Sequence, residues 1–393
     1  MNLGNNFFRT LWASFAHELW VICTHASLLL VLAGGIFLYG FLYNYMYEPN
    51  VIRESSVAVV DHSVTPLSRE YVRLLDATPQ VKVVGESGWP EAVQRLRRQE
   101  VVGVLYLPKD FDAKVGRGEQ AVYGVYATTT AFLYFAALQE AAAGAMLALN
   151  DAVRPEQVVF LPADAVSSLV SARSIEVVGI PLYNYTDGYG TYLIPAVLMV
   201  IIFQTLLFVI GMLCGREHEM RFAGLPIVEP SFPQIAALVW GKALAYGALY
   251  ALFAVFMLGF LPYLFQLPHE AGALNIGRLL VPYLLATSFF GLTFSICCND
   301  SDAPLLLIAF FSVGLIFVSG VSYPLERMPF YWRWLHALLP AAPGTLAFVQ
   351  LSSMGASLSE ISTQWYTLWI QCVVYFFTAC WAYRYRLRMA GRR

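Results

Sequence analysis

Six long stretches without a charged residue limit what this chain can fold into. A membrane-spanning helix needs about 20 apolar residues, because the hydrocarbon core is about 30 Å thick and a helix rises about 1.5 Å per residue. The first stretch covers residues 26–47. The other five hold 28, 27, 21, 23 and 23 uncharged residues, and they lie between Asp187 and Arg216, Lys242 and Glu270, Arg278 and Asp300, Asp302 and Glu326, and Glu360 and Arg384. The sequence therefore predicts an α-helical integral membrane protein with six transmembrane helices.

The composition agrees with a membrane protein and argues against several other classes. Charged residues make up only 13% of the chain and hydrophobic residues 58%, whereas an average soluble domain carries about 25% charged residues. The net charge is −2, so no basic excess is present to neutralise phosphates, and nucleic acid is not an expected partner. All six cysteines lie in or beside apolar segments, so no disulfide framework is expected.

The arginines at the C-terminus indicate the orientation in the membrane. Five of them follow the last apolar stretch within ten residues: Arg384, Arg386, Arg388, Arg392 and Arg393. Because positive residues are enriched on the cytoplasmic side, this end is expected in the cytoplasm. Six spans place the N-terminus there too. Residues 1–25 are expected to form a cytoplasmic amphipathic helix lying at the membrane surface, because apolar residues recur at helical spacing from Phe8 to Leu19.

A further uncharged stretch, within residues 326–359, does not look like a seventh span. It contains Pro340 and Pro343 together with His336. Prolines there would leave backbone groups unpaired in a straight helix surrounded by lipid. We therefore expect a broken segment that is re-entrant or interfacial. A seventh span would also place the two termini on opposite sides.

Residues 48–187, between the first and second spans, are expected to form an α/β domain outside the membrane. They hold 12 Lys/Arg and 17 Asp/Glu. Strand patterns alternate with helical patterns, which indicates a largely parallel sheet. The strands are expected at 55–61, 81–86, 101–107 and 122–127, and the helices at 66–77, 89–99 and 130–150. The last helix carries Gln139 and Glu140 at its centre, which argues against a membrane span.

No motif in the chain indicates catalysis or a cofactor. Asp61, His62, Ser63 and Ser68 have the order of ordinary turn residues and match no nucleophile elbow. The phosphate-binding motif of ATPases is absent, because Gly241-Lys242 is followed by alanine and lacks the upstream glycine. The chain is therefore not expected to be an enzyme or to hold a metal.

Four sequence blocks occur at matching positions of one known family. They are VAVVDHSVTPLSREYVRLLDATPQVKVVG (57–85), LYLPKDF (105–111) with RGEQAVYGVY (117–126), CGREHEMRFAGLPIVEPSFPQIAALVWGKALAY (214–246) and GVSYPLERMPFYWRWLHALLPAAPGTLAF (320–348). In this order the chain resembles the membrane subunit of ATP-binding-cassette exporters of the type-2 permease family. It is most similar to the bacterial branch with a large periplasmic domain between the first and second spans.

The resemblance implies a function, partners and a location. The chain would be the permease subunit of an ATP-driven ABC exporter in the bacterial inner membrane, with residues 48–187 periplasmic and spans two to six within 188–393. A separate cytoplasmic ATPase subunit would bind ATP and Mg. A second permease copy or a paralogue would complete the path, membrane lipid would surround it, and a periplasmic adaptor and an outer-membrane channel are further partners of such exporters.

The resemblance also implies where the ATPase subunit would dock. The two regions are the N-terminal helix, with Trp12 and Phe15, and the cytoplasmic elbow 215–234. The elbow offers charged and polar side chains at Arg216, Glu217, His218, Glu219 and Arg221. These charges could equally mark the membrane boundary and reach toward water. Lys242 either pairs with Glu217 or Glu219 or anchors a helix end.

The spans carry almost no ionisable residues, which argues against coupling to an ion gradient. Their polar residues are neutral: Gln204, Thr205, Ser288, Thr293, Ser312 and Ser319. Such a lining fits a hydrophobic or amphiphilic substrate that leaves the cytoplasm or the inner leaflet. The same residues could simply hold helices together by hydrogen bonds.

The main alternative function is a membrane-anchored receptor or adaptor whose periplasmic domain binds a protein or ligand without transport. A receptor would need a cytoplasmic signalling domain, and residues 384–393 are too short for one. A membrane enzyme would need clustered acidic and histidine residues at the membrane face, and His269-Glu270 stands alone.

Overall fold

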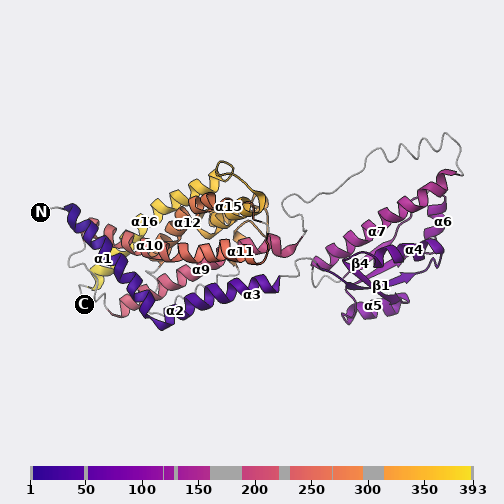
Figure 1. The fold of residues 1–393 in the computed structure, drawn as a ribbon, viewed down its shortest axis with the longest axis horizontal. Helices are drawn as coiled ribbons and strands as arrows, with labels where there is room; N and C mark the ends of the chain where they lie inside the picture. The colour runs from indigo at the N-terminus through magenta and orange to yellow at the C-terminus, as the bar shows by residue number, and fades with distance from the viewer. Residues whose placement is uncertain are drawn as a thin grey trace. The chain divides into compact units, whose positions relative to one another are not determined.

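The computed structural model describes residues 3–47, 52–117, 119–127, 132–159, 188–220, 231–267, 269–294 and 314–390. The chain divides into two compact units. Unit 1 comprises Met1–Asn50 and Pro181–Arg393, and unit 2 comprises Val51–Ile180. Each is described by itself (Figure 1).

Unit 1 begins with two long helical segments. Helix α1 (Leu3–Thr24) covers the predicted N-terminal helix. It is followed by α2 (Ala26–Ala33), the π-helical turn η1 (Gly34–Leu38) and α3 (Tyr39–Met46). Together these three form one apolar segment, Ala26–Met46, that is long enough to cross a membrane.

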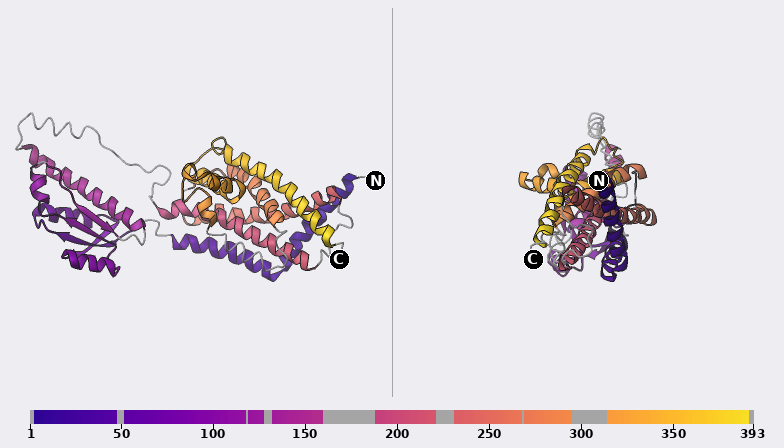
Figure 2. Two further views of the ribbon diagram at one scale, coloured as in Figure 1. Left: turned by 180° about the vertical axis from the view of Figure 1, so that it is seen from behind. Right: turned by 90° about the vertical axis from the view of Figure 1, so that its left-hand side faces the viewer.

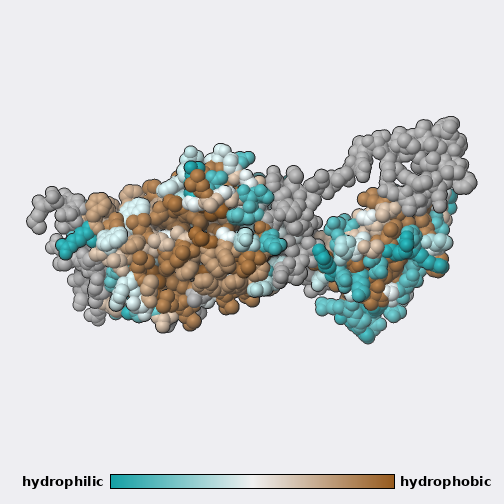
Figure 3. Space-filling view, in the orientation of Figure 1, coloured by the Kyte–Doolittle hydropathy of each residue, from teal (hydrophilic) through white to brown (hydrophobic). Residues whose placement is uncertain are grey.

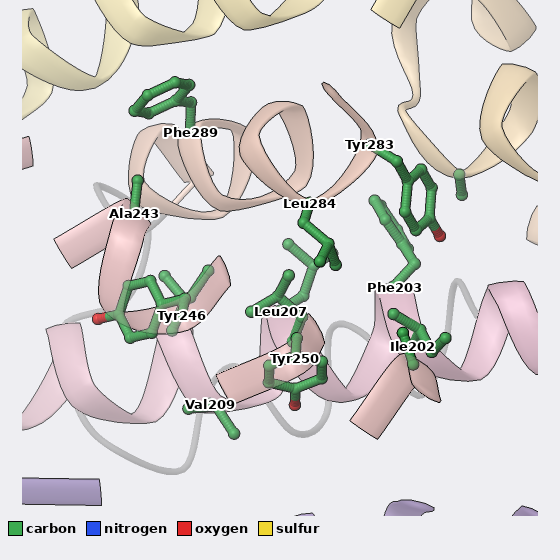
Figure 4. Close-up of a cluster of buried hydrophobic side chains, with 14 of the residues drawn as sticks. Ile202, Phe203, Leu207, Val209, Ala243, Tyr246, Tyr250, Tyr283, Leu284 and Phe289 are labelled. Carbon is green, nitrogen blue, oxygen red and sulfur yellow. The ribbon is translucent and has the colours of Figure 1, made fainter. Parts of the chain in front are cut away.

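The core of unit 1 lies between three further long helices. They are α9 (Tyr189–Glu219), α10 (Phe232–Val255) and α12 (Ala273–Phe294). Figure 4 shows their apolar side chains meeting, with Phe203, Leu207, Tyr250 and Leu284 in the contact. Helix α10 continues through the π-helical turn η2 (Phe256–Phe260) into α11 (Leu261–Leu264). Apolar side chains also cover most of the face of unit 1 that Figure 3 shows, as expected for helices surrounded by lipid.

Four segments of the described residues are long and apolar enough to cross a membrane. They are Ala26–Met46, Gly190–Glu219, Phe232–Leu264 and Ala273–Phe294. Helices α14 (Phe330–Leu338) and α15 (Ala341–Met354) make a fifth if they count as one span, but they are bent by 86°. The break falls at Leu339 and Pro340, where the sequence predicts it.

The last helix of unit 1 is α16 (Ser362–Ala390), which covers the predicted sixth span but is not among the four apolar segments. Its C-terminal end lies at the same end of unit 1 as α1 (Figure 2). The short 3₁₀ turn η4 (Leu325–Arg327) precedes α14. Most of the predicted span between Asp302 and Glu326 lies outside the described residues, so the count of six spans stays a prediction.

Unit 2 contains a four-stranded sheet with the strand order β2-β1-β3-β4. Strand β1 (Ser55–Asp61) is parallel to β2 (Val81–Glu86) and to β3 (Gly103–Leu107). Strand β4 (Gly124–Ala127) is antiparallel to β3. The sheet is therefore mixed at one edge, and β3 and β4 each begin two residues later than the sequence pattern predicts.

Helices cover both faces of this sheet (Figure 1). Helices α4 (Pro66–Asp76) and α7 (Phe132–Val159) pack on one face, where α6 (Phe111–Gly116) joins them, and α5 (Trp89–Arg97) packs on the other. Alternation along β1 explains this, because Val57 and Val59 point to one face and Ala58 and Val60 to the other. Helix α7 is longer than predicted and exposes Gln139 and Glu140.

Candidate functional site

A buried lysine connects three helices at one end of unit 1. Lys242 of α10 is fully buried. Its Nζ contacts the carboxylate of Glu18 on α1 and the carboxylate of Glu217 on α9. Both acidic residues are themselves buried, at 2% and 8% exposure. Buried charges persist when they are paired, so these three side chains depend on one another.

Two tyrosines complete the hydrogen bonds of the carboxylates. The Tyr246 hydroxyl donates to Oε2 of Glu18 over 2.8 Å, and the Tyr383 hydroxyl donates to Oε2 of Glu217 over 3.1 Å. We call Glu18, Glu217, Lys242, Tyr246 and Tyr383 the charge cluster. Since Tyr383 belongs to α16, the charge cluster joins α1, α9, α10 and α16.

A glycine next to the lysine lets α1 approach α10 closely. A Cβ on Gly241 would overlap the carbonyl oxygen of Leu11 and lie 2.8 Å from the Cβ of Ser14. The face of α1 that meets α10 carries Thr10, Ser14 and Glu18, which recur every four residues and are all buried. Residues four apart lie on one side of a helix. The polar side of α1 therefore packs inward and carries its carboxylate to Lys242.

The charge cluster lies far from the other end of the helices. Near the start of α16, the Trp365 indole N–H donates to the carbonyl oxygen of Arg278 over 3.1 Å. Tyr383 follows 18 residues later, which is about 27 Å along a helix. This is close to the thickness of the hydrocarbon core, about 30 Å. The charge cluster therefore lies near one end of unit 1, next to Arg384 and Arg386, and Arg278 lies near the other, about one membrane thickness away.

The predicted elbow residues take different environments. Glu217 points inward to Lys242, whereas Glu219 is exposed. Arg216 and His218 are half-buried, and Arg221 lies outside the described residues. Of the alternatives open for Lys242, pairing with Glu217 is the one observed, and pairing with Glu219 is not.

Sequence reasoning missed Glu18, the second partner of Lys242. The predicted periodicity of α1 rests on its apolar residues, and none of these is fully buried. Phe8 and Trp12 are exposed, and Leu11, Phe15 and Leu19 are half-buried; Trp12 stacks on Phe15 with ring centroids 5.1 Å apart. The four-residue recurrence of Thr10, Ser14 and Glu18 was the available signal for the inward face.

The predicted path residues mostly bond to their own helices. Thr205 donates to the carbonyl of Ile201 over 2.7 Å, and Ser288 donates to that of Leu284 over 2.7 Å. Thr293 also meets Thr378 of α16 at 2.8 Å. Such bonds hold helices together and satisfy hydroxyls in an apolar surrounding.

The other path residues are scattered. Gln204 on α9 is half-buried, Ser319 donates to the carbonyl of Ile316 over 2.6 Å, and Ser312 lies outside the described residues. The small cavity between α9, α11 and α15 is lined by Ile194, Pro195, Leu198, Pro262, Leu267, Phe348 and Ser352. None of the predicted path residues lines it.

Among the residues that the structure describes, no group of three His, Cys, Asp or Glu side chains could hold a metal ion. The most concentrated charge in unit 1 is the charge cluster. The charge cluster links helices, because Lys242 of α10 bonds simultaneously to Glu18 of α1 and Glu217 of α9.

Comparison with known protein families identifies a match over most of the chain. A family model described as ABC-2 family transporter protein matches residues 25–381. The match spans parts of both units and ends within α16. No curated protein matches the chain.

Proposed function

The chain belongs to the ABC-2 family of transporter proteins, and on that premise we propose that it is the permease subunit of an ATP-driven exporter. Permeases of this family work with a separate ATPase subunit. The proposed cargo is a hydrophobic or amphiphilic molecule taken from the cytoplasm or the inner leaflet. The neutral hydroxyls and amide of Gln204, Thr205, Ser288, Thr293, Ser312 and Ser319 remain the proposed contacts along the path.

The observation that carries the proposal is the charge cluster. In our proposal the ATPase subunit docks on the exposed side of α1, around Trp12, and on the elbow that follows Glu219. Lys242 holds α1 to α9 and α10 through two ion pairs. A displacement of α1 by the ATPase would then move α9 and α10 with it. Ion pairs buried in a dry interior resist separation, because each partner alone would be an uncompensated charge.

The proposed topology has six spans with both termini in the cytoplasm and residues 48–187 outside it. The arginines after Tyr383 support this orientation, since positive residues favour the cytoplasmic side. The charge cluster then lies at the cytoplasmic boundary, where an ATPase can reach α1. Two permease chains would enclose the path, and a periplasmic adaptor with an outer-membrane channel would continue it.

Two neighbouring glutamates allow a matched test of the coupling role. Glu217→Gln removes a charge from the charge cluster, whereas Glu219→Gln removes one from the exposed side of the same helix end. Each variant is co-purified with its ATPase subunit, and ATP turnover and export of a fluorescent amphiphile are measured in vesicles. We expect Glu217→Gln to lower the amount exported per ATP hydrolysed several-fold.

Glu219→Gln is the control for Glu217→Gln, and two results would contradict the proposal. Glu219→Gln should change the export-to-hydrolysis ratio less than Glu217→Gln, while both variants bind the ATPase subunit and elute as folded complexes. If Glu217→Gln exports with the normal ratio, the charge cluster does not couple the two subunits. If Glu219→Gln alone releases the ATPase subunit, the exposed elbow charge provides docking and Glu217 does not.

A further inference from the structure

Helix α14 presents a run of aromatic side chains away from the protein. Phe330 is 67% exposed, Tyr331 57%, Trp332 45% and Trp334 73%. His336 lies in the second half of the helix and is buried, and its Nδ1–H donates to the carbonyl oxygen of Val318 over 2.9 Å. Helix α14 therefore packs inward at His336, whereas every residue from Phe330 to Trp334 is exposed. The exposed aromatic side chains therefore need a different environment from bulk water.

The position of α14 along the bundle can be read from its contacts with α16. The Gln371 side-chain amide donates to the carbonyl oxygen of Ala337 over 2.7 Å. Gln371 comes six residues after Trp365, which bonds to Arg278, so α14 ends about 9 Å further along the helix axis than that bond. This is far closer to Arg278 than to the charge cluster. The C-terminal end of α14 thus lies in the half of the bundle that is opposite the charge cluster, about 9 Å inward from the level of Arg278.

The direction of α14 follows from the bend before α15. Gly344 of α15 lies against the ring of Tyr283, and the carbonyl oxygen of Ser352 accepts from the backbone N–H of Glu270 over 2.9 Å. Helix α15 therefore runs alongside α12, which is one of the apolar spans. Since α14 makes an angle of 86° with α15, it runs across the spans and along the plane of the membrane.

One arginine precedes the aromatic run and a second lies within it. Arg327 in η4 and Arg333 in α14 are exposed, and within the described ranges neither guanidinium is paired with a carboxylate. Glu326 is exposed beside them. Tryptophan and tyrosine are enriched at the level of lipid headgroups, and a guanidinium binds phosphate through two parallel hydrogen bonds. A second copy of the chain would instead bury these unpaired charges, which is unfavourable.

We propose that α14 and η4 bind anionic phospholipid headgroups in the leaflet opposite α1. Phe330, Tyr331, Trp332 and Trp334 lie among the glycerol groups and upper acyl chains. Arg327 and Arg333 bind the phosphates. The bent pair is thereby an interfacial anchor that holds the start of α15 at a fixed depth beside α9 and α12. This inference does not depend on the export function.

The proposed depth of the α14 aromatic residues is tested with the full chain in lipid vesicles. The lipids are brominated near the headgroup, and the bromine atoms quench tryptophan emission on contact. Trp332→Phe/Trp334→Phe should lower the quenchable emission, and the remaining quenching comes from other exposed tryptophans such as Trp12, Trp20 and Trp381. Trp240→Phe is the matched control, because Trp240 is half-buried and packs edge-on against Phe289 at 5.1 Å. If the double variant is quenched as much as the wild type, the aromatic run does not contact lipid and the proposal is wrong.

The preference for anionic lipid is tested by the lipid that stays bound after solubilisation from mixed phosphatidylglycerol and phosphatidylcholine membranes. A basic residue near an anionic surface favours binding about five-fold, so Arg327→Gln/Arg333→Gln should lower the ratio of retained phosphatidylglycerol to phosphatidylcholine by up to about thirty-fold. Arg97→Gln, at an exposed site in α5, should leave that ratio unchanged. An unchanged ratio in the double variant contradicts the proposal. So does efficient crosslinking of Trp334→Cys between two chains, which would show that a second copy covers α14.

Discussion

Replacing Lys242 with methionine should destabilise unit 1 more than any surface substitution. The Lys242 side chain is fully buried, and the side chains of Glu18 and Glu217 are only 3% and 11% exposed. Without the lysine, two buried carboxylates remain, each with a single tyrosine donor. Removing one partner of a buried ion pair costs about 3–5 kcal/mol, because the remaining charge is uncompensated. We expect Lys242→Met to lower the free energy of unfolding by about 3–5 kcal/mol.

A triple variant separates charge from packing. Lys242→Met/Glu18→Gln/Glu217→Gln removes all three charges while nearly keeping the side-chain volumes. Buried ion pairs replaced together by neutral residues are often neutral in stability or even stabilising. The triple variant should therefore recover most of the stability that the single variant loses. Lys109→Met, at an exposed site in unit 2, is the control and should stay within about 0.5 kcal/mol of the wild type.

The measurement is the apparent midpoint of unfolding of the full chain in detergent at a fixed heating rate, followed by tryptophan emission. The wild type and Lys109→Met should have nearly the same midpoint. The midpoint of the triple variant should be slightly lower, and that of Lys242→Met should be the lowest by a clear margin. Two results would refute the reasoning. Either Lys242→Met melts with the wild type, or the triple variant melts as low as the single one, in which case packing and not charge is responsible.

Two further predictions concern other contacts. Gly241→Ala should push α1 away from α10, because its Cβ would overlap the Leu11 carbonyl oxygen. Limited proteolysis should then cut α1 faster. Gly247→Ala is the control, because no atom lies near its new Cβ, and it should leave the rate of cleavage unchanged. Burial raises the pKa of the Tyr71 hydroxyl, which donates to the Ala142 carbonyl over 3.0 Å. Above about pH 10 the unfolded chain loses this proton while the folded unit keeps it, so unit 2 should lose stability as the pH rises. The midpoint of denaturant unfolding of unit 2 in the full chain, followed by circular dichroism, should show this loss, and Tyr71→Phe should make that midpoint less dependent on pH.

Local patterns were sufficient to predict the four strands and three longer helices of unit 2, but not the short helix α6. Strands β1 and β2 have the predicted bounds, and α4 begins after Thr65 as its sequence indicates. There the Thr65 and Ser68 side chains each accept a hydrogen bond from the other's backbone N–H. Proline follows at the first helical position, where its fixed φ suits a helix. The antiparallel direction of β4 was not predictable, because strand direction depends on how the chain crosses the sheet and not on residue alternation.

Four of the six predicted apolar spans are found in the described residues, and they were readable from the sequence because each depends on a continuous run of residues. The charge cluster was not, since it brings together residues from 18 to 383 along the chain. The sequence gives no distance between separate helices, so Lys242 had several possible partners. The bend between α14 and α15 was predictable from Pro340, but the exposure of the α14 aromatics depends on which part of the helix packs against the rest of unit 1.

We propose that this ABC-2 family chain moves cargo only when an ATPase subunit drives it through α1. The most direct measurement uses sealed vesicles that contain the full chain with or without the ATPase subunit that co-purifies with it, loaded with a fluorescent amphiphile. Uphill movement of the amphiphile is expected only when the ATPase subunit and ATP are both present, and it should be weaker with Glu217→Gln. Uphill movement by the chain alone, without ATP, would contradict the claim.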